Sequence, residues 1–183
     1  IDPVLAYAPD TLDSAQSKII GIAVRKGFIP DGAVHELIKK LQWKWYTIRF
    51  LPHSLHPTDE RSHDGYYLQD FMTAWVETSQ SIEQTLDQYR ECHIIIGMRF
   101  HSMILAIDHH IPFIWISYST KTKEILEQTK WPYAFSQEVN AEDIIKSIEN
   151  IELNYMNLKM KLTDMHRRFQ DEYFTQFQNL IWK

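Results

Sequence analysis

The alternation of short apolar runs with helical stretches is the feature that most constrains the fold of this chain. Four runs rich in β-branched and aromatic residues are predicted to be buried strands: 18–24, 45–51, 93–97 and 111–117. Stretches with helical character separate or follow these runs. Because strands that alternate with helices are typical of βαβ units, the pattern predicts an α/β fold. We expect a doubly wound, Rossmann-like, mostly parallel sheet with helices on both faces.

Several helices have recognisable starts. Asp31, Ser81 and Asn140 are predicted to cap three of them, Ser81 through a capping box. The first of these helices has apolar residues at helical spacing, at positions 34, 37, 38 and 41. The remaining predicted elements are helices at 65–72, 99–108, from 120 onward and through 151–183, and a short strand at 74–78.

The length of 183 residues suits one sizeable domain. We predict an irregular segment at 1–17, a Rossmann-like domain over 18–150 and a C-terminal helical extension over 151–183. The first residue is Ile1 rather than methionine. We therefore expect the chain to be a piece of a longer protein.

Composition argues against several classes of function. A net charge of −5 gives no reason to expect a nucleic-acid partner. No stretch approaches the length of a membrane span, and no secretory signal heads the chain. Cys92 is the single cysteine, which excludes a disulfide framework and fits a reducing compartment, so a cytoplasmic location is expected. The 5 glycines form neither of the glycine-rich phosphate-binding motifs.

Cationic side chains follow three of the predicted strands. Arg25, Arg99 and Lys121 each come just after an apolar run, and His101 lies two residues beyond Arg99. The carboxyl ends of parallel strands form the usual ligand site of such sheets, where helix N-termini also favour anions. These residues therefore predict a site for a small, highly charged anion, with His101 as the proton carrier. The alternative is that the Arg-x-His pair only decorates a helix start.

Other candidate residues have simpler interpretations. His53, His56 and His63 with Asp59 match no zinc spacing, so no metal site is expected, although this loop follows the second strand and could line the same face. Cys92 is expected to be buried rather than reactive. The tryptophans are expected mostly in the core or at interfaces.

The chain resembles a known family in two neighbouring stretches. Residues 94–106 read IIIGMRFHSMILA, and residues 111–118 read IPFIWISY, with Lys121 shortly after. This block is similar to the hallmark of the polysaccharide pyruvyl transferases, a G-M-R-L-H stretch, a small apolar helix, a V-P-F-I-A-L-S-Y strand and a lysine. The upstream strand that ends at Arg25 is also similar, so the resemblance runs from about residue 18 to about residue 135.

The resemblance implies a specific architecture and reaction. Members resemble GT-B glycosyltransferases, in which two Rossmann-like domains face each other, and this chain would be the C-terminal, donor-binding one. They transfer the enolpyruvyl group of phosphoenolpyruvate to a pair of hydroxyls on a sugar or lipid-linked glycan, in polysaccharide and cell-wall biosynthesis. Arg25, Arg99 and Lys121 would then hold the donor and His101 would be the general acid, with no metal and no cofactor.

The resemblance also implies a partner and leaves alternatives. The N-terminal domain of the same protein would contact the acceptor, so we expect the isolated chain to be inactive. One alternative is the donor domain of a GT-B glycosyltransferase that uses a nucleotide sugar. Another is a non-catalytic binding module on the same fold.

Overall fold

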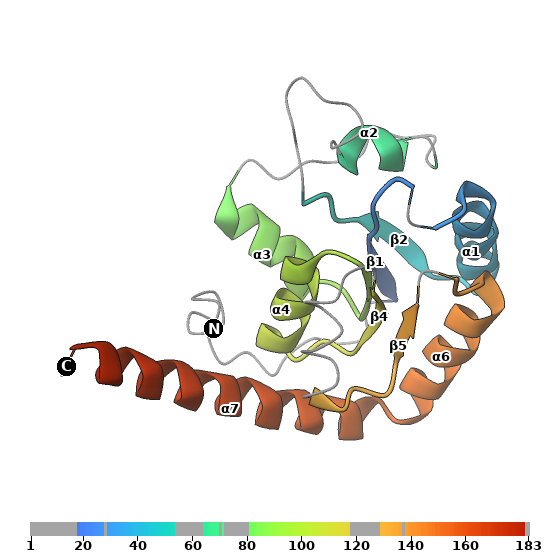
Figure 1. Ribbon diagram of the computed structural model, residues 1–183. Coiled ribbons are helices and arrows are strands. Elements are labelled where there is room, and N and C mark those ends of the chain that lie inside the picture. Colours follow the sequence, from blue (N-terminus) through green and yellow to red (C-terminus); the bar gives the residue numbers. More distant parts are fainter. Residues whose placement is uncertain are drawn as a thin grey trace.

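The computed structural model describes residues 18–27, 29–53, 64–69, 71, 81–117, 129–136 and 138–181. In this part of the chain, five parallel strands form one sheet in the order β2-β1-β3-β4-β5 (Figure 1). The strands are β1 (Ile19–Ala23), β2 (Thr47–Phe50), β3 (Ile94–Gly97), β4 (Phe113–Ser117) and β5 (Ala134–Ser136). All four predicted strands that fall in the described ranges are confirmed, each somewhat shorter than its apolar run.

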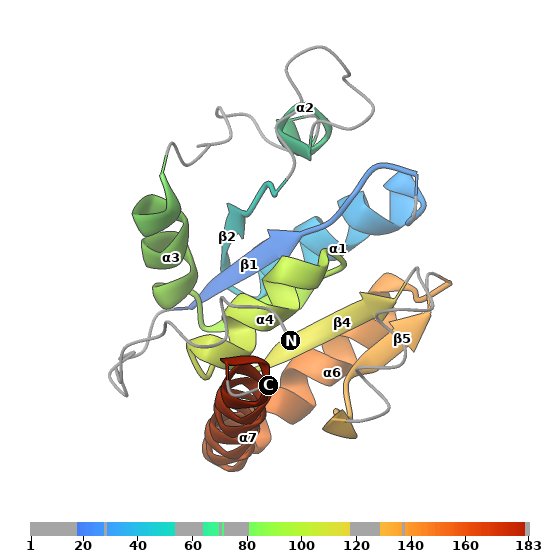
Figure 2. The ribbon, with the colours of Figure 1, turned by 60° about the vertical axis from the view of Figure 1, so that its left-hand side comes forward.

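Helices cover both faces of the sheet. They are α1 (Asp31–Trp43), α2 (Asp64–Gln69), α3 (Ile82–Arg90), α4 (Phe100–Asp108), α6 (Ala141–Leu153) and α7 (Tyr155–Ile181). Helices α1 and α6 pack together on one face, and α3, α4 and α7 lie on the other (Figure 2). The predicted α/β, Rossmann-like class is therefore confirmed. The strand predicted at 74–78 and the helix predicted from 120 lie outside the described residues.

Two of the three predicted caps are confirmed. The Ser81 hydroxyl accepts a hydrogen bond from the backbone N–H of Gln84, and the Asn140 side chain accepts one from that of Asp143. The prediction for Asp31 is wrong, because Pro30 occupies the capping position and Asp31 is the first residue of α1. A proline fits there, since its φ angle suits the entry to a helix.

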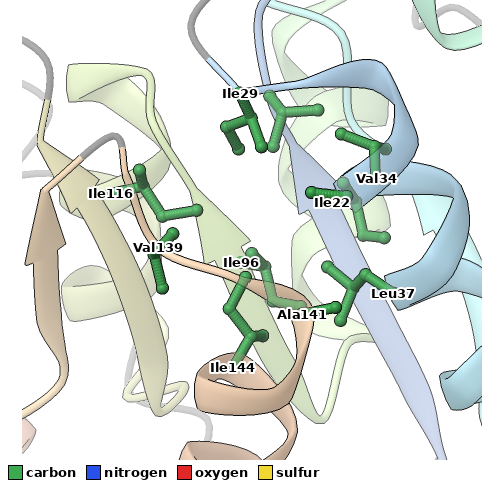
Figure 3. Close-up of a pocket in the computed structure, with 11 residues that line it drawn as sticks. Ile22, Ile29, Val34, Leu37, Ile96, Ile116, Val139, Ala141 and Ile144 are labelled. Atoms are coloured by element: carbon green, nitrogen blue, oxygen red, sulfur yellow. The ribbon is translucent and has the colours of Figure 1, made fainter.

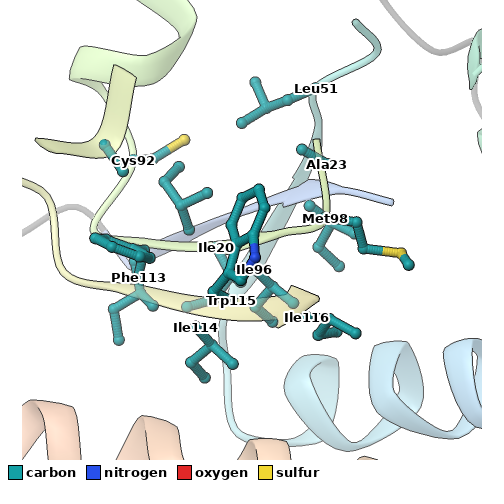
Figure 4. Packing of buried hydrophobic residues seen from close by; sticks show 14 of the residues in the cluster. Ile20, Ala23, Leu51, Cys92, Ile96, Met98, Phe113, Ile114, Trp115 and Ile116 are labelled. Carbon is teal, nitrogen blue, oxygen red and sulfur yellow. The ribbon is translucent and has the colours of Figure 1, made fainter. Parts of the chain in front are cut away.

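The central strands β1, β3 and β4 are buried on both faces, which explains why they are apolar without a polar alternation. Every residue of β3 is buried. Along β4, Trp115 points to the side that carries Cys92 and Leu51, whereas Ile114 points toward the opposite helices (Figure 4). The central strands therefore form the core between the two layers of helices.

The C-terminal helix begins as part of this core. Helix α6 ends at Leu153, Asn154 separates the two helices, and α7 packs against α4. Leu158, Leu162 and Met165 are buried in the same cluster as the strands. The first turns of α7 therefore stabilise the sheet rather than project from it.

The order of the strands places a crevice at a defined position. From β1 the chain moves to β2 on one side, and it then crosses to β3 on the other side of β1. Such a reversal is the topological switch point, where open α/β sheets bind ligands beyond the carboxyl ends of their strands. We call this end of the sheet the carboxyl edge. Helix α2 lies beyond it, above the ends of β1 and β2 (Figures 1 and 2).

Candidate functional site

Arg25 and Arg99 lie at equivalent positions beyond two adjacent strands at the switch point. Ala23 and Gly97 are directly paired across β1 and β3, and each arginine lies two residues beyond its member of this pair. The backbone N–H of Met98 continues the ladder by donating to the carbonyl of Ala23 at 3.0 Å. The two cations predicted from the sequence are therefore in the same register on adjacent strands.

Arg99 is already engaged by a carboxylate. Its Nε donates to Oδ2 of Asp64 at 3.0 Å, and its Nη2 donates to Oδ1 of the same residue. The Asp64 side chain is only 3% exposed and that of Arg99 is 16% exposed. Such a two-pronged pair is the strongest form of the arginine–carboxylate contact, because both donors are aligned with both acceptors. The sequence predicted the cation but not its acidic partner.

Hydrogen bonds of Asp64 and Tyr67 attach helix α2 to the rest of the domain. Oδ2 of Asp64 also accepts the backbone N–H of His53 at 3.2 Å, just beyond the end of β2. The hydroxyl of Tyr67 donates to Oδ1 of Asp31, at the start of α1, at 3.0 Å. Asp64 thereby joins the segment after β2 to the segment after β3.

A histidine–tyrosine pair lies next to the ion pair. Nε2 of His53 lies 2.5 Å from the hydroxyl oxygen of Tyr89, which is fully buried in α3. Burial lowers the pKa of His53 to about 4, and the positive charges of His101 and Arg99 act in the same direction, although Asp64 opposes them. His53 is therefore neutral at pH 7. The hydrogen bonds of Asp64 to Arg99 and to the backbone of His53 place these three residues side by side.

His101 lies on the first turn of α4 and is exposed. The turn of α4 that carries His101 packs closely against the end of β3. The Ser102 hydroxyl donates to the carbonyl of Arg99 at 2.6 Å, and a Cβ at Gly97 would overlap that hydroxyl. Gly97 is therefore required for the close approach of α4 to β3, which sets the positions of Arg99 and His101.

The other candidates from the sequence have different outcomes. Lys121 lies outside the described residues. Cys92 is buried as expected, and burial raises the pKa of its thiol to about 12, so the thiol is unreactive. The described ranges contain no group of three or more potential metal ligands. Among the tryptophans in the described ranges, Trp115 and Trp131 lie in the core as expected, whereas Trp43 and Trp45 are exposed, and their expected place at an interface stays a prediction.

An apolar cavity lies under the same edge but does not belong to the charged site. It opens between the sheet and helices α1 and α6 (Figure 3). Its lining includes Ile22, Ile96 and Ile116 from the strands, Val34 and Leu37 from α1, and Ile144 from α6. No charged side chain lines it, so it offers nothing to an anion.

The arrangement is suited to binding a small anion beside a proton carrier. Two arginines lie just beyond paired strand ends at the switch point, and His101 follows one of them by two residues. The sequence missed Asp64 and Tyr89, because neither stands in a motif and their burial depends on how α2 and α3 pack. A site of this kind is typical of proteins that bind phosphate or carboxylate groups.

The polysaccharide pyruvyl transferase family matches residues 1–120 of the 183, which include β1 to β4, Arg25, Arg99 and His101. The chain therefore belongs to the polysaccharide pyruvyl transferase family. This membership supports a transferase function in polysaccharide biosynthesis, and it implies a sugar or glycan acceptor. No curated protein matches the chain. Within the described ranges, none of the helices has the length and apolar character needed to cross a membrane.

Proposed function

We propose that this chain is the donor-binding domain of an enzyme that transfers the enolpyruvyl group of phosphoenolpyruvate to two sugar hydroxyls, forming a pyruvate ketal. The observation that carries the proposal is the position of Arg25 and Arg99, each two residues beyond the paired ends of β1 and β3, with His101 two residues further on, in a member of this family. In a GT-B arrangement, a second domain would face this end of the sheet and contact the acceptor.

The donor carries a phosphate and a carboxylate, which are the groups that guanidiniums bind best. Arg25 and Arg99 would hold these groups, and Lys121 would add a third positive charge. Holding the donor against fixed charges also stabilises the phosphate as it leaves.

His101 would act as the general acid. Its imidazolium gives a proton to C3 of the donor, which becomes the methyl group, and positive charge develops at C2. One sugar hydroxyl attacks C2 and its proton returns to the imidazole. The bond between C2 and the phosphate oxygen then breaks, the second hydroxyl closes the ketal, and its proton leaves with the phosphate.

The proposal is tested by an activity measurement on the protein that carries both domains. Release of phosphate from phosphoenolpyruvate should depend on an acceptor glycan, and His101→Gln should lower kcat by about 10²- to 10⁴-fold with little change in donor affinity. His93→Gln is the matched control, since His93 precedes β3 at the opposite end of the sheet and pairs with Glu152. A near-wild-type rate in His101→Gln would remove the general-acid role.

A further inference from the structure

The ion pair with Asp64 uses only part of the hydrogen-bonding capacity of Arg99. An arginine has five N–H donors, and Asp64 occupies one on Nε and one on Nη2 of Arg99. The two donors on Nη1 and the second donor on Nη2 point away from this edge of the guanidinium. No other side-chain acceptor from the described part of the chain contacts Arg99. One edge of the fork is therefore fixed, and the other end is left for a second acceptor.

The burial of the pair indicates that it persists when an anion binds. Asp64 is almost completely buried, and a buried carboxylate that loses its cationic partner is strongly unfavourable. An anion that pulled Arg99 away would carry that penalty. An anion that binds the remaining N–H groups does not.

We propose that Asp64 is a positioning residue for Arg99. It holds the Nε–Nη2 edge of the guanidinium, so that the Nη1 end meets the phosphate or carboxylate of the ligand in one orientation. Because Asp64 also holds the backbone N–H of His53, the same carboxylate links the segment after β2 to that orientation. The inference rests on the proposed function for the identity of the ligand, but not for the effect on Arg99 itself.

The first experiment measures Arg99 without any ligand. In the wild-type chain, ¹H–¹⁵N NMR should show a slowly exchanging Nε–H for Arg99, assigned by its loss in Arg99→Lys. In Asp64→Asn this proton should exchange about tenfold faster or more, because its charged acceptor is gone. An unchanged exchange rate would overturn the positioning role.

The second experiment measures binding of phosphoenolpyruvate and of inorganic phosphate by calorimetry. Removing the negative charge of Asp64 should tighten anion binding if only net charge matters. The positioning role predicts the opposite change in affinity, so Asp64→Asn should weaken anion binding about tenfold. Asp164→Asn is the matched control, because Asp164 pairs with Arg167 on the exposed surface of α7, and its affinity should equal wild type. Tighter binding by Asp64→Asn would overturn the proposal.

Further variants show whether Asp64 acts through Arg99. Arg99→Lys keeps the charge but lacks the fork, so it should also weaken binding about tenfold, and adding Asp64→Asn should cause no further loss. Additive losses would overturn the proposal. If Asp64→Asn does not fold, the test rests on Arg99→Lys alone. Wild-type affinity for the anion in Arg99→Lys would then overturn the proposal. If the exchange result holds but the wild type binds neither anion, the donor-site proposal fails and the positioning of Arg99 stands.

Discussion

The imidazole of His53 and the hydroxyl of Tyr89 are joined by a 2.5 Å contact beneath the carboxyl edge. The two residues come from different segments, one just after β2 and the other on α3. Burial and the neighbouring Cys92 hold the pKa of Tyr89 well above its usual range, so the hydroxyl stays neutral. The contact is therefore a hydrogen bond between two neutral groups.

Tyr89→Phe should lower the free energy of unfolding by about 1 kcal/mol, because Nε2 of His53 loses its partner in a partly buried place. Urea denaturation measures this change. Tyr133→Phe removes a hydroxyl with no side-chain partner among the described residues and should change stability by less than about 0.5 kcal/mol. Equal stability of the two variants would contradict the account of the pair.

A second prediction concerns acid conditions. Burial lowers the pKa of His109 from 6.5 to about 4, and the charges of Arg90, His110 and His166 act in the same direction, while Asp87 opposes them. The unfolded chain therefore binds more protons than the folded chain in this range. His109 contributes its full stability above pH 6.5, and this contribution is lost as the pH falls toward 4.

The free energy of unfolding should fall by at most about 1.4 kcal/mol per pH unit for each such histidine. Urea denaturation across this range measures the slope for wild type and for His109→Gln. The variant should show a shallower slope, and the remainder should come chiefly from His53, whose pKa is lowered in the same way. The slopes are compared rather than the absolute values, since the substitution also changes packing. Parallel slopes would contradict the assignment to His109.

The sequence predicts the layers of this fold well because the signals are local. Continuous β-branched runs identify buried parallel strands, and Ser81 and Asn140 identify helix starts, since each depends only on neighbours in the chain. Strand β5 was not predicted, because its three residues are too short to show a period. The prediction of Asp31 as a cap is wrong, since the capping position falls one residue earlier, at Pro30, and no side chain caps the helix.

The site was only partly predictable for a related reason. Arg25, Arg99 and His101 stand at strand ends, which a strand pattern locates. Asp64 follows a run of polar residues in the sequence, so nothing in the local pattern marks it as buried. Its burial depends on the way that α2 folds over the carboxyl edge, and no local pattern reports such a contact.

A third prediction concerns Gly97 at the base of α4. Gly97→Ala should destabilise the chain by roughly 1–3 kcal/mol, because the new Cβ would overlap the Ser102 hydroxyl that holds the start of α4. Gly32→Ala is the matched control. Its Cβ would meet nothing within 4 Å, and alanine suits a helix, so it should be neutral or stabilising by up to about 1 kcal/mol. Thermal unfolding compares the two variants, and equal effects would show that α4 does not need this close approach.

The most direct test of the donor site is a calorimetric titration of the 183-residue chain with phosphoenolpyruvate, with UDP and inorganic phosphate as comparators. Phosphoenolpyruvate should bind more tightly than either comparator, and Arg99→Ala should remove this preference. A preference for UDP would contradict the donor-site proposal and would assign the chain to a transferase that uses a nucleotide sugar.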